Sequence, residues 1–288
     1  MFACHLFGID RQIYYRSIRR KAVKKTKAEQ VVVLVKEVRV KMPRAGIRKL
    51  YHILSPDLLK MNIGRDKFAD ILRANHLLII PRRSYHVTTN SQHRFRKHKN
   101  LILEMSIVRP EQLWVSDITY IGKRDKPCYL SLITDAYSKK IMGYYVANDL
   151  TAGSSVRALK MAIRVRKDKT LTLIHHSDRG FQYCADEYQK VLNKHEIKCS
   201  MTNNGDPYEN AVAERINGIL KQEFNIDNYH ADLAIMKKVV KEAVDIYNQV
   251  RPHYSNYFLT PNQMHSQCEL KIRTYKRKNS IETSLNTV

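Results

Sequence analysis

The sequence predicts an α/β fold in which a mixed five-stranded sheet with helices follows an all-α N-terminal region. After residue 109, three strand-like apolar segments precede alternating helical and strand-like segments. Residues 1–80, in contrast, read as helices separated by short turns. The chain has 288 residues, 43% of them hydrophobic, which is enough for one substantial core and smaller modules.

Positive charge is strong and uneven along the chain. There are 51 Lys and Arg against 27 Asp and Glu, a formal net charge of +24. Residues 1–110 hold 25 of the basic residues and 7 of the acidic ones, a net charge of +18. This balance indicates an extended polyanion such as nucleic acid as the partner, with the first third as the main binding region. A basic surface that serves only solubility would not be concentrated in this way.

Residues 1–41 are expected to be helical. Residues 2–20 suggest two short helices that meet at Gly8, with Asp10 capping the second, and a separate basic helix is expected over 26–41. The short pair resembles half of a helix-turn-helix that reads DNA. An amphipathic hairpin that only packs is an equally open interpretation.

Residues 42–80 repeat this theme. Helices are predicted over 46–54 and 65–75, with a turn at 62–64 that contains Gly64. The segment is therefore interpreted as a helix-turn-helix DNA-binding module.

Residues 81–108 are predicted to be a basic linker. Tyr85 and Phe95 alternate with cations there, so the linker could follow a phosphate backbone and stack on exposed bases. A solvated tether between domains is the alternative interpretation, and the two are compatible. The candidate DNA contacts in this linker are Arg94, Arg96 and Lys97.

Residues 109–265 are expected to form the main domain. Strands predicted over 114–121, 129–134 and 140–147 are close enough in sequence for an antiparallel meander. The segments that follow are helices over 151–166, 185–195, 207–224 and 231–248 and strands over 171–176 and 197–201. Three strands followed by helix, strand, helix, strand, helix is the order of a ribonuclease H-like fold.

Three carboxylates stand out in this domain. Asp117 interrupts an apolar strand, and Asp178 directly follows another, where an acidic side chain can hold a metal ion. Glu214 lies 36 positions after Asp178 in a predicted helix. The sequence motifs around Asp117, Asp178 and Glu214, rather than their order and spacing alone, set these three residues apart as candidates.

Two other glutamates near Glu214 are weaker candidates for the third position. Glu223 lies about 180° round the helix from Glu214 and roughly 13 Å along its axis. Glu209 falls in the first turn, where the helix dipole is a sufficient reason for a carboxylate. The expected core stripe of this helix consists of Ala213, Ile216, Leu220 and Phe224.

Four sequence motifs carry a resemblance to a known family. They are W-x-x-D-I-T-Y at 114–120, H-S-D-R-G-x-Q-Y at 176–183, E-N-A-x-A-E-R at 209–215 followed by K-x-E, and Y-N-x-x-R-P-H at 247–253 before T-P. With the order Asp, Asp, Glu, the chain resembles bacterial insertion-sequence transposases of the DDE superfamily, whose catalytic core is similar to that of retroviral integrases. The resemblance runs from about residue 46 to 261.

The resemblance implies a site and a reaction. The first and fourth strands would be neighbours, which would bring Asp117 beside Asp178, and two Mg²⁺ ions, with Mn²⁺ as substitute, would be held by these residues and Glu214. Cleavage at the transposon ends would free a 3′-hydroxyl that attacks another phosphodiester. Four residues near the acidic set are candidates to grip terminal phosphates, with surface solvation as the alternative for each: Arg179, Asn210, Arg215 and Lys221.

The expected partners and location follow from the resemblance and the composition. Members of this family commonly act as homo-multimers on DNA. The chain is expected to be produced in one of three ways: alone, together with an upstream-frame protein, or as a frameshift fusion. Its 5 cysteines form no C-x-x-C pair, and no apolar run approaches the ~18 residues of a membrane span. A bacterial cytoplasmic, nucleoid-associated protein is therefore expected. Residues 266–288 are expected to be a frayed basic tail.

Two other functions compete with this one. A structure-specific nuclease of the ribonuclease H-like fold also uses acidic residues and metal, but does not need the basic N-terminal third. A non-catalytic helix-turn-helix DNA-binding regulator leaves all three acidic motifs unexplained.

Overall fold

The computed structural model describes most of the chain. The described residues are 8, 10–80, 98–103, 105–122, 127–203, 210–229 and 232–272. The candidate DNA contacts Arg94, Arg96 and Lys97, together with Glu209, lie outside these ranges. Among the helices that the structure describes, none is both long and apolar enough to cross a membrane.

A five-stranded mixed sheet forms the centre of the main domain. Its strands are β1 (Leu113–Ile121), β2 (Cys128–Asp135), β3 (Ile141–Ala147), β4 (Ile174–Ser177) and β5 (Lys198–Met201). The strand order is β3-β2-β1-β4-β5, in which β1 pairs antiparallel with β2 and parallel with β4. The expected meander of the first three strands and the expected neighbours β1 and β4 are both confirmed. The fold is ribonuclease H-like.

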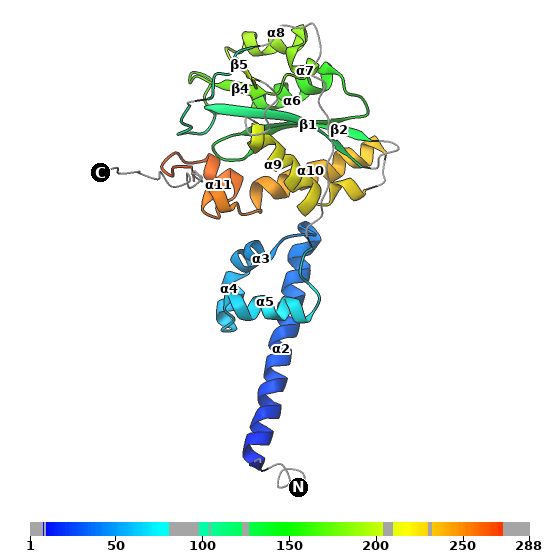
Figure 1. Ribbon diagram of the computed structural model, residues 1–288, viewed down its shortest axis with the longest axis vertical. Coiled ribbons are helices and arrows are strands. Elements are labelled where there is room, and N and C mark those ends of the chain that lie inside the picture. Colours follow the sequence, from blue (N-terminus) through cyan, green and yellow to red (C-terminus); the bar gives the residue numbers. More distant parts are fainter. Residues whose placement is uncertain are drawn as a thin grey trace, which may run out of the picture.

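Helices cover both faces of the sheet (Figure 1). One layer contains α6 (Ala152–Val165), α7 (Phe181–Cys184) and α8 (Asp186–Lys194); the other contains α9 (Ala211–Glu223), α10 (Leu233–Gln249) and α11 (Pro261–His265), with the short 3-10 turns Ile226–Asn228 and Tyr254–Asn256. Gly143 lets α6 approach β3 closely, because a Cβ there would lie 2.2 Å from the Ala158 carbonyl oxygen. The short helix α7 was not predicted.

The N-terminal region differs from the expected short helices. A single continuous helix, α2, runs through Arg11–Lys41, so the predicted break between residues 20 and 26 is wrong. No Gly or Pro occurs within α2, and the Asp10 side chain caps it by accepting from the Gln12 N–H at 2.6 Å. Residues 1–7, which would form the other half of the hairpin, lie outside the described ranges. An isolated N-terminal helix-turn-helix is therefore not the structure of residues 10–41.

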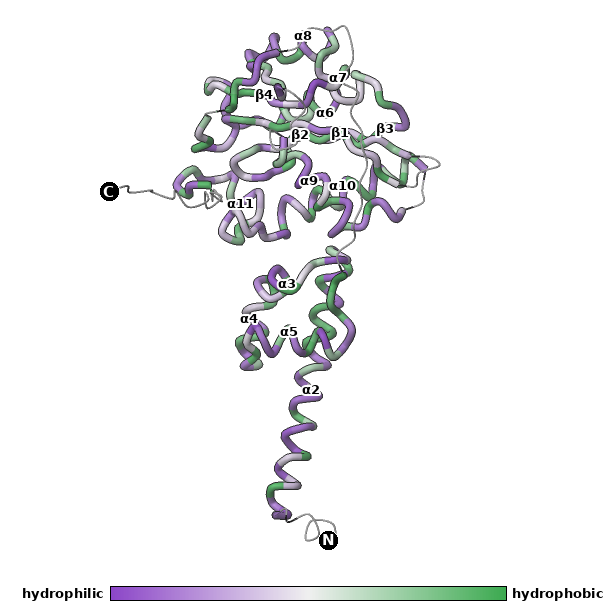
Figure 2. The backbone as a smooth tube through the Cα atoms, viewed as in Figure 1, coloured by the Kyte–Doolittle hydropathy of each residue, from purple (hydrophilic) through white to green (hydrophobic). Residues whose placement is uncertain are grey.

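The second half of α2 packs in a compact helical module. Its partners are α3 (Ile47–Ile53), α4 (Ser55–Lys60) and α5 (Arg65–Ala74). The helices predicted over 46–54 and 65–75 are present, whereas the intervening α4 was not predicted. Figure 2 shows hydrophobic residues on the part of α2 beside α5, and a mixture of hydrophilic and hydrophobic residues on the part that projects away.

This helical module contacts the α9 side of the main domain. The Arg44 N–H donates to the Glu223 carbonyl at 3.0 Å, Lys49 pairs with the Glu223 carboxylate at 2.9 Å, and His52 stacks on Phe258. Apolar residues of both parts belong to one buried cluster. The module and the main domain are therefore packed together through α3 and the end of α9.

The chain after Pro261 is more ordered than expected. α11 begins with a capping box on Thr260 and buries Met264 and His265. The Tyr137 hydroxyl donates to the Leu270 carbonyl at 2.5 Å. A frayed tail from residue 266 is thus wrong for residues 266–272, and residues 273–288 lie outside the described ranges.

Candidate active site

Asp117 lies in the middle of β1 and faces the layer that contains α9. Side chains alternate along a strand, and Leu113 and Val115 on this face share a buried cluster with Ala213 of α9. Trp114, on the other face, packs in the cluster around α6 and α8. The alternation of β1 therefore directs the half-buried Asp117 carboxylate toward α9.

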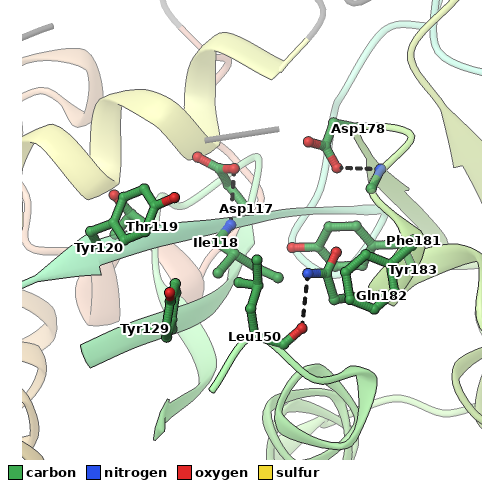
Figure 3. A pocket seen from close by; sticks show the side chains of 11 residues that line it. Asp117, Ile118, Thr119, Tyr120, Tyr129, Leu150, Asp178, Phe181, Gln182 and Tyr183 are labelled. Atoms are coloured by element: carbon green, nitrogen blue, oxygen red, sulfur yellow. Dashed lines mark hydrogen bonds between the residues drawn. The ribbon is translucent and has the colours of Figure 1, made fainter. Parts of the chain in front are cut away.

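Asp178 directly follows the last residue of β4. Its Oδ1 accepts from the Gly180 N–H at 3.0 Å, and a Cβ on Gly180 would lie 3.0 Å from the same oxygen. Asp117 and Asp178 both line a small cavity of about 60 Å³ and lie on the same side of β1 (Figure 3). The rest of the cavity wall comes from β1 residues 118–120, Tyr129 of β2, Leu150, Gly180 and the α7 residues 181–183.

Glu214 lies in the first turn of α9, and its side chain is exposed. The predicted core stripe of this helix, Ala213, Ile216, Leu220 and Phe224, is buried as expected. On the same helix, Asn217 is also buried, and its Nδ2 donates to Asp117 Oδ2 at 2.7 Å. Helix α9 thus carries Glu214 in its first turn and orients Asp117 through Asn217.

The three carboxylates influence one another electrostatically. Burial and the negative charge of Asp178 raise the pKa of Asp117 to about 7, with a further contribution from Glu214. Partial desolvation and the charge of Asp178 also raise the pKa of Glu214. The charge of Asp178 therefore disfavours ionisation of both Asp117 and Glu214.

The donor chemistry suits a hard divalent cation. All three side chains offer carboxylate oxygens, the ligands that Mg²⁺ and Mn²⁺ prefer. Within the described ranges, no three His, Cys, Asp or Glu side chains are grouped closely enough to hold a metal ion as they stand. Asp117 and Asp178 line the cavity, whereas Glu214 does not.

The four predicted DNA contacts of the main domain have different surroundings. Arg179 donates from Nε to the Thr202 carbonyl at 2.6 Å. Burial lowers the pKa of the half-buried Lys221, and the charges of Asp227 and Asp117 oppose this shift. Asn210 is buried and donates to the Ser116 carbonyl at 2.9 Å, so its amide joins α9 to β1. Arg215 is exposed beside a groove. DNA contact by these four residues stays a prediction.

Comparisons with known proteins identify the family. The Integrase core domain family matches residues 108–207, and a second Integrase core domain family matches residues 195–261. The insertion element IS600 uncharacterized 31 kDa protein of Shigella sonnei is 32% identical over 257 residues, which cover 87% of this chain and 92% of that protein. The chain belongs to the family of insertion-sequence transposases with an integrase-like core. Its function is thus that of a DNA transposase, and the family implies polynucleotidyl transferase activity.

Further similar proteins match smaller or larger shares of the transposase. Transposase InsF for insertion sequence IS3fB of Escherichia coli is 33% identical over 159 residues, covering 55% of each chain. The magnesium complex of the HTLV-2 integrase catalytic core domain in its trimeric form covers 55% of this chain and 98% of its own, with 20% identity and a TM-score of 0.45. The simian T-cell lymphotropic virus intasome in complex with PP2A regulatory subunit B56 gamma covers 80% of this chain and 78% of its own, with 19% identity and a TM-score of 0.48.

Two features of the transposase site were missed from the sequence. Asn217 could have been recognised, because it lies three positions after Glu214 and residues at this spacing share a helix face. The R-P-H motif had no assigned role. Arg251 in that motif is buried and donates from Nε and Nη2 to the two carboxylate oxygens of Glu223, both at 2.8 Å. Glu223 of the K-x-E motif is therefore held in ion pairs, away from the acidic set.

The two histidines that precede Asp178 are buried in the transposase core. The His175 Nε2 lies 2.6 Å from the Ser116 hydroxyl and 2.8 Å from the Tyr188 hydroxyl. His176 Nδ1 lies 2.9 Å from the Ser200 hydroxyl. Burial, together with the charge of His176, lowers the pKa of His175 to about 3, so its ring is neutral at ordinary pH. Both side chains serve the interior of the fold.

Proposed function

We propose that this transposase cleaves DNA at the ends of its element and joins them to a target by 3′-hydroxyl attack, with Asp117, Asp178 and Glu214 as ligands of two Mg²⁺ ions. The observation that supports the proposal is the cavity shared by Asp117 of β1 and Asp178 at the end of β4, together with the electrostatic effect of Asp178 on Glu214 in the first turn of α9. Bound divalent cations activate the attacking oxygen and neutralise charge on the phosphate. Mn²⁺ is the expected substitute.

The chain's own residues have distinct tasks in this proposal. Asn217 fixes the orientation of Asp117, while the exposed Glu214 side chain has the rotational freedom to turn toward the aspartates and the DNA. Arg179, Arg215 and Lys221 supply positive charge near the acidic set for the phosphates that flank the scissile bond.

The reaction consists of two successive phosphoryl transfers at one site. Water attacks the phosphodiester at the element end and displaces a 3′-hydroxyl, and that hydroxyl then attacks a target phosphodiester and displaces its 3′-oxygen. One P–O bond forms and one breaks in each step, so no covalent protein intermediate is needed. We further expect the protein to act as a homo-multimer on DNA, at the nucleoid in the bacterial cytoplasm. It is expected to be produced alone, together with an upstream-frame protein, or as a frameshift fusion.

A strand-transfer assay with linear duplex that carries the element end tests the proposal. Asp178→Asn is expected to abolish both cleavage and joining with Mg²⁺, while DNA binding and Tm stay close to those of the unsubstituted protein. Asp186→Asn, an exposed aspartate in the first turn of α8, is the matched control and should retain activity.

The same assay separates the competing functions. A structure-specific nuclease would cleave without joining, and a DNA-binding regulator would bind without doing either. Either result for the unsubstituted protein, or cleavage by a folded Asp178→Asn protein, would contradict the proposal.

A further inference from the structure

A second, larger depression lies outside the acidic site, between the helical module and the main domain. This groove is formed by α3, the first turns of α9 and the segment 251–258. Its volume of about 440 Å³ is far larger than that of one water molecule, which is about 30 Å³. The side chains along it that are cationic or can become so are Arg48, Lys49, Lys139, Arg215, Arg251 and His253. No Asp or Glu of the described residues lines the groove.

The positive charge of this groove is only partly neutralised within the protein. Glu223, at the end of α9, pairs with Lys49 at 2.9 Å and with Arg251 at 2.8 Å. In the part of the chain that the structure describes, Arg48 and Arg215 have no acidic side chain within ion-pair distance, and both are exposed. The groove therefore carries an excess of positive charge.

The excess of positive charge also affects the pKa of a buried histidine, His253. Burial and the positive charges of Arg251 and Lys139 hold the pKa of His253 well below its usual range. Burial lowers the pKa of Lys139 to about 8 as well, so a cation there is held at a cost to its solvation. A bound anion would oppose both downward pKa shifts by favouring the charged forms.

Helix α9 joins this groove to the acidic site. Glu214 and Arg215 are adjacent, and successive residues of a helix point about 100° apart. Arg215 lines the groove together with Ile216 and Ile219, whereas Glu214 interacts with Asp117 and Asp178. A DNA strand that crosses the first turn of α9 would meet the acidic site on one side and the cationic groove on the other.

We propose that this groove binds backbone phosphates of the DNA strand that enters the acidic site, held by Arg48 of the helical module and Arg215 of the main domain. The inference rests on the proposed function and adds a second DNA-binding site to it. A guanidinium group offers a phosphate two parallel N–H donors, so each arginine can bind in a bidentate manner. Because one wall belongs to each part of the protein, a bound strand would also strengthen the contact of the module with the main domain.

Duplex binding by the full chain tests this site. The probe is a fluorescein-labelled duplex of arbitrary sequence, titrated in EDTA over a series of KCl concentrations. Arg48→Gln and Arg215→Gln are each expected to weaken binding about five-fold and to reduce the slope of log K against log [KCl] by about 0.9, the value for a single neutralised phosphate. The matched control, Arg164→Gln, removes an exposed arginine from α6 on the opposite face of the sheet and should change neither quantity.

The outcomes distinguish the groove from the proposed function. Arg48→Gln and Arg215→Gln proteins with an unchanged slope and affinity, or an Arg164→Gln protein whose binding weakens as much, would overturn the groove. Since EDTA prevents metal-dependent chemistry, this result does not depend on catalysis. An unsubstituted protein that binds duplex but neither cleaves nor joins end DNA with Mg²⁺ overturns the proposed function. In that case the slopes of log K against log [KCl] still show whether the groove binds phosphates. A protein that binds no duplex overturns both.

Discussion

At the scale of single residues, α9 separates two glutamates that the sequence places in neighbouring motifs. Glu214 is exposed and electrostatically linked to Asp178, whereas Glu223 accepts from Arg251 and Lys49 in largely buried ion pairs. Removing the Glu214 carboxylate should therefore affect catalysis, whereas removing the Glu223 carboxylate should affect the stability of the fold.

Glu214→Gln is expected to lower end cleavage more than about 100-fold with Mg²⁺ and with Mn²⁺, because even residues that only support a metal ligand are worth about 10- to 100-fold. Glu223→Gln should instead retain cleavage and lower the free energy of unfolding by about 2 kcal/mol, because it weakens charge-assisted hydrogen bonds to Arg251. Cleavage assays and urea unfolding of both proteins check the pair. If the Glu223→Gln protein is folded but inactive while the Glu214→Gln protein is active, the third metal ligand is Glu223 and not Glu214.

At the scale of elements, α11 is fastened to the end of β2 by a buried polar cluster. His265 Nε2 lies 3.3 Å from Glu111 Oε1, and its Nδ1 lies 3.0 Å from the Ser138 hydroxyl and 3.7 Å from Asp135 Oδ1. Burial lowers the pKa of His265, but the two carboxylates outweigh it, and the net shift is upward. The cluster explains why the chain near residue 265 is folded.

This upward shift predicts the pH dependence of α11. A histidine whose pKa is raised by folding contributes stability that is fully present below its unfolded pKa of about 6.5 and is lost as pH rises through its folded value. His265→Gln should thus destabilise the protein by about 2 kcal/mol at low pH, where the charged hydrogen bonds are complete, and by less at high pH. Urea unfolding between about pH 6 and pH 9 measures this difference.

The control for α11 is His195→Gln at the end of α8. Its effect on the free energy of unfolding should not decrease with pH as the effect of His265→Gln does. A destabilisation by His265→Gln that is constant or that grows with pH would contradict a charged His265 in the folded protein.

At the scale of the whole molecule, α2 extends the basic N-terminal region away from the main domain (Figure 1). A helix of 31 residues is roughly 46 Å long, and most residues of its first half are exposed. This half belongs to residues 1–110, which the charge distribution predicts to be the main DNA-binding region.

Neutralising this half of α2 should flatten the salt dependence of duplex binding. The substitutions to Gln are at four exposed cations, Arg16, Arg19, Arg20 and Lys24. For every phosphate that the protein no longer neutralises, the slope of log K against log [salt] should fall by about 0.9. The matched control changes four exposed lysines in and beside the α6 and α8 layer to Gln, Lys167, Lys169, Lys190 and Lys194. Equal slopes for both proteins would show that α2 has no special part in DNA binding.

Much of the fold was predictable because its signals are local. Alternation and helical spacing identified all five strands and the main helices, and the continuity of α2 could also have been predicted from the absence of Gly and Pro in it. Short elements such as α4 and α7 have too few residues to show a period. They are stabilised by packing instead, through Leu58 in α4 and Tyr183 in α7.

The sequence alone determined the ribonuclease H-like order of elements and the buried stripe of α9, because these depend on residue type and spacing within single segments. It also supplied the candidate set Asp117, Asp178 and Glu214, because a local motif that resembles a known family surrounds each carboxylate. Only the tertiary structure decided that Asn217 holds Asp117 from 100 positions away, that Glu223 pairs with Arg251, and that α3 and α9 enclose a cationic groove. These contacts join segments far apart in the chain. No local periodicity records which surfaces meet once burial of apolar area has packed the helices against the sheet.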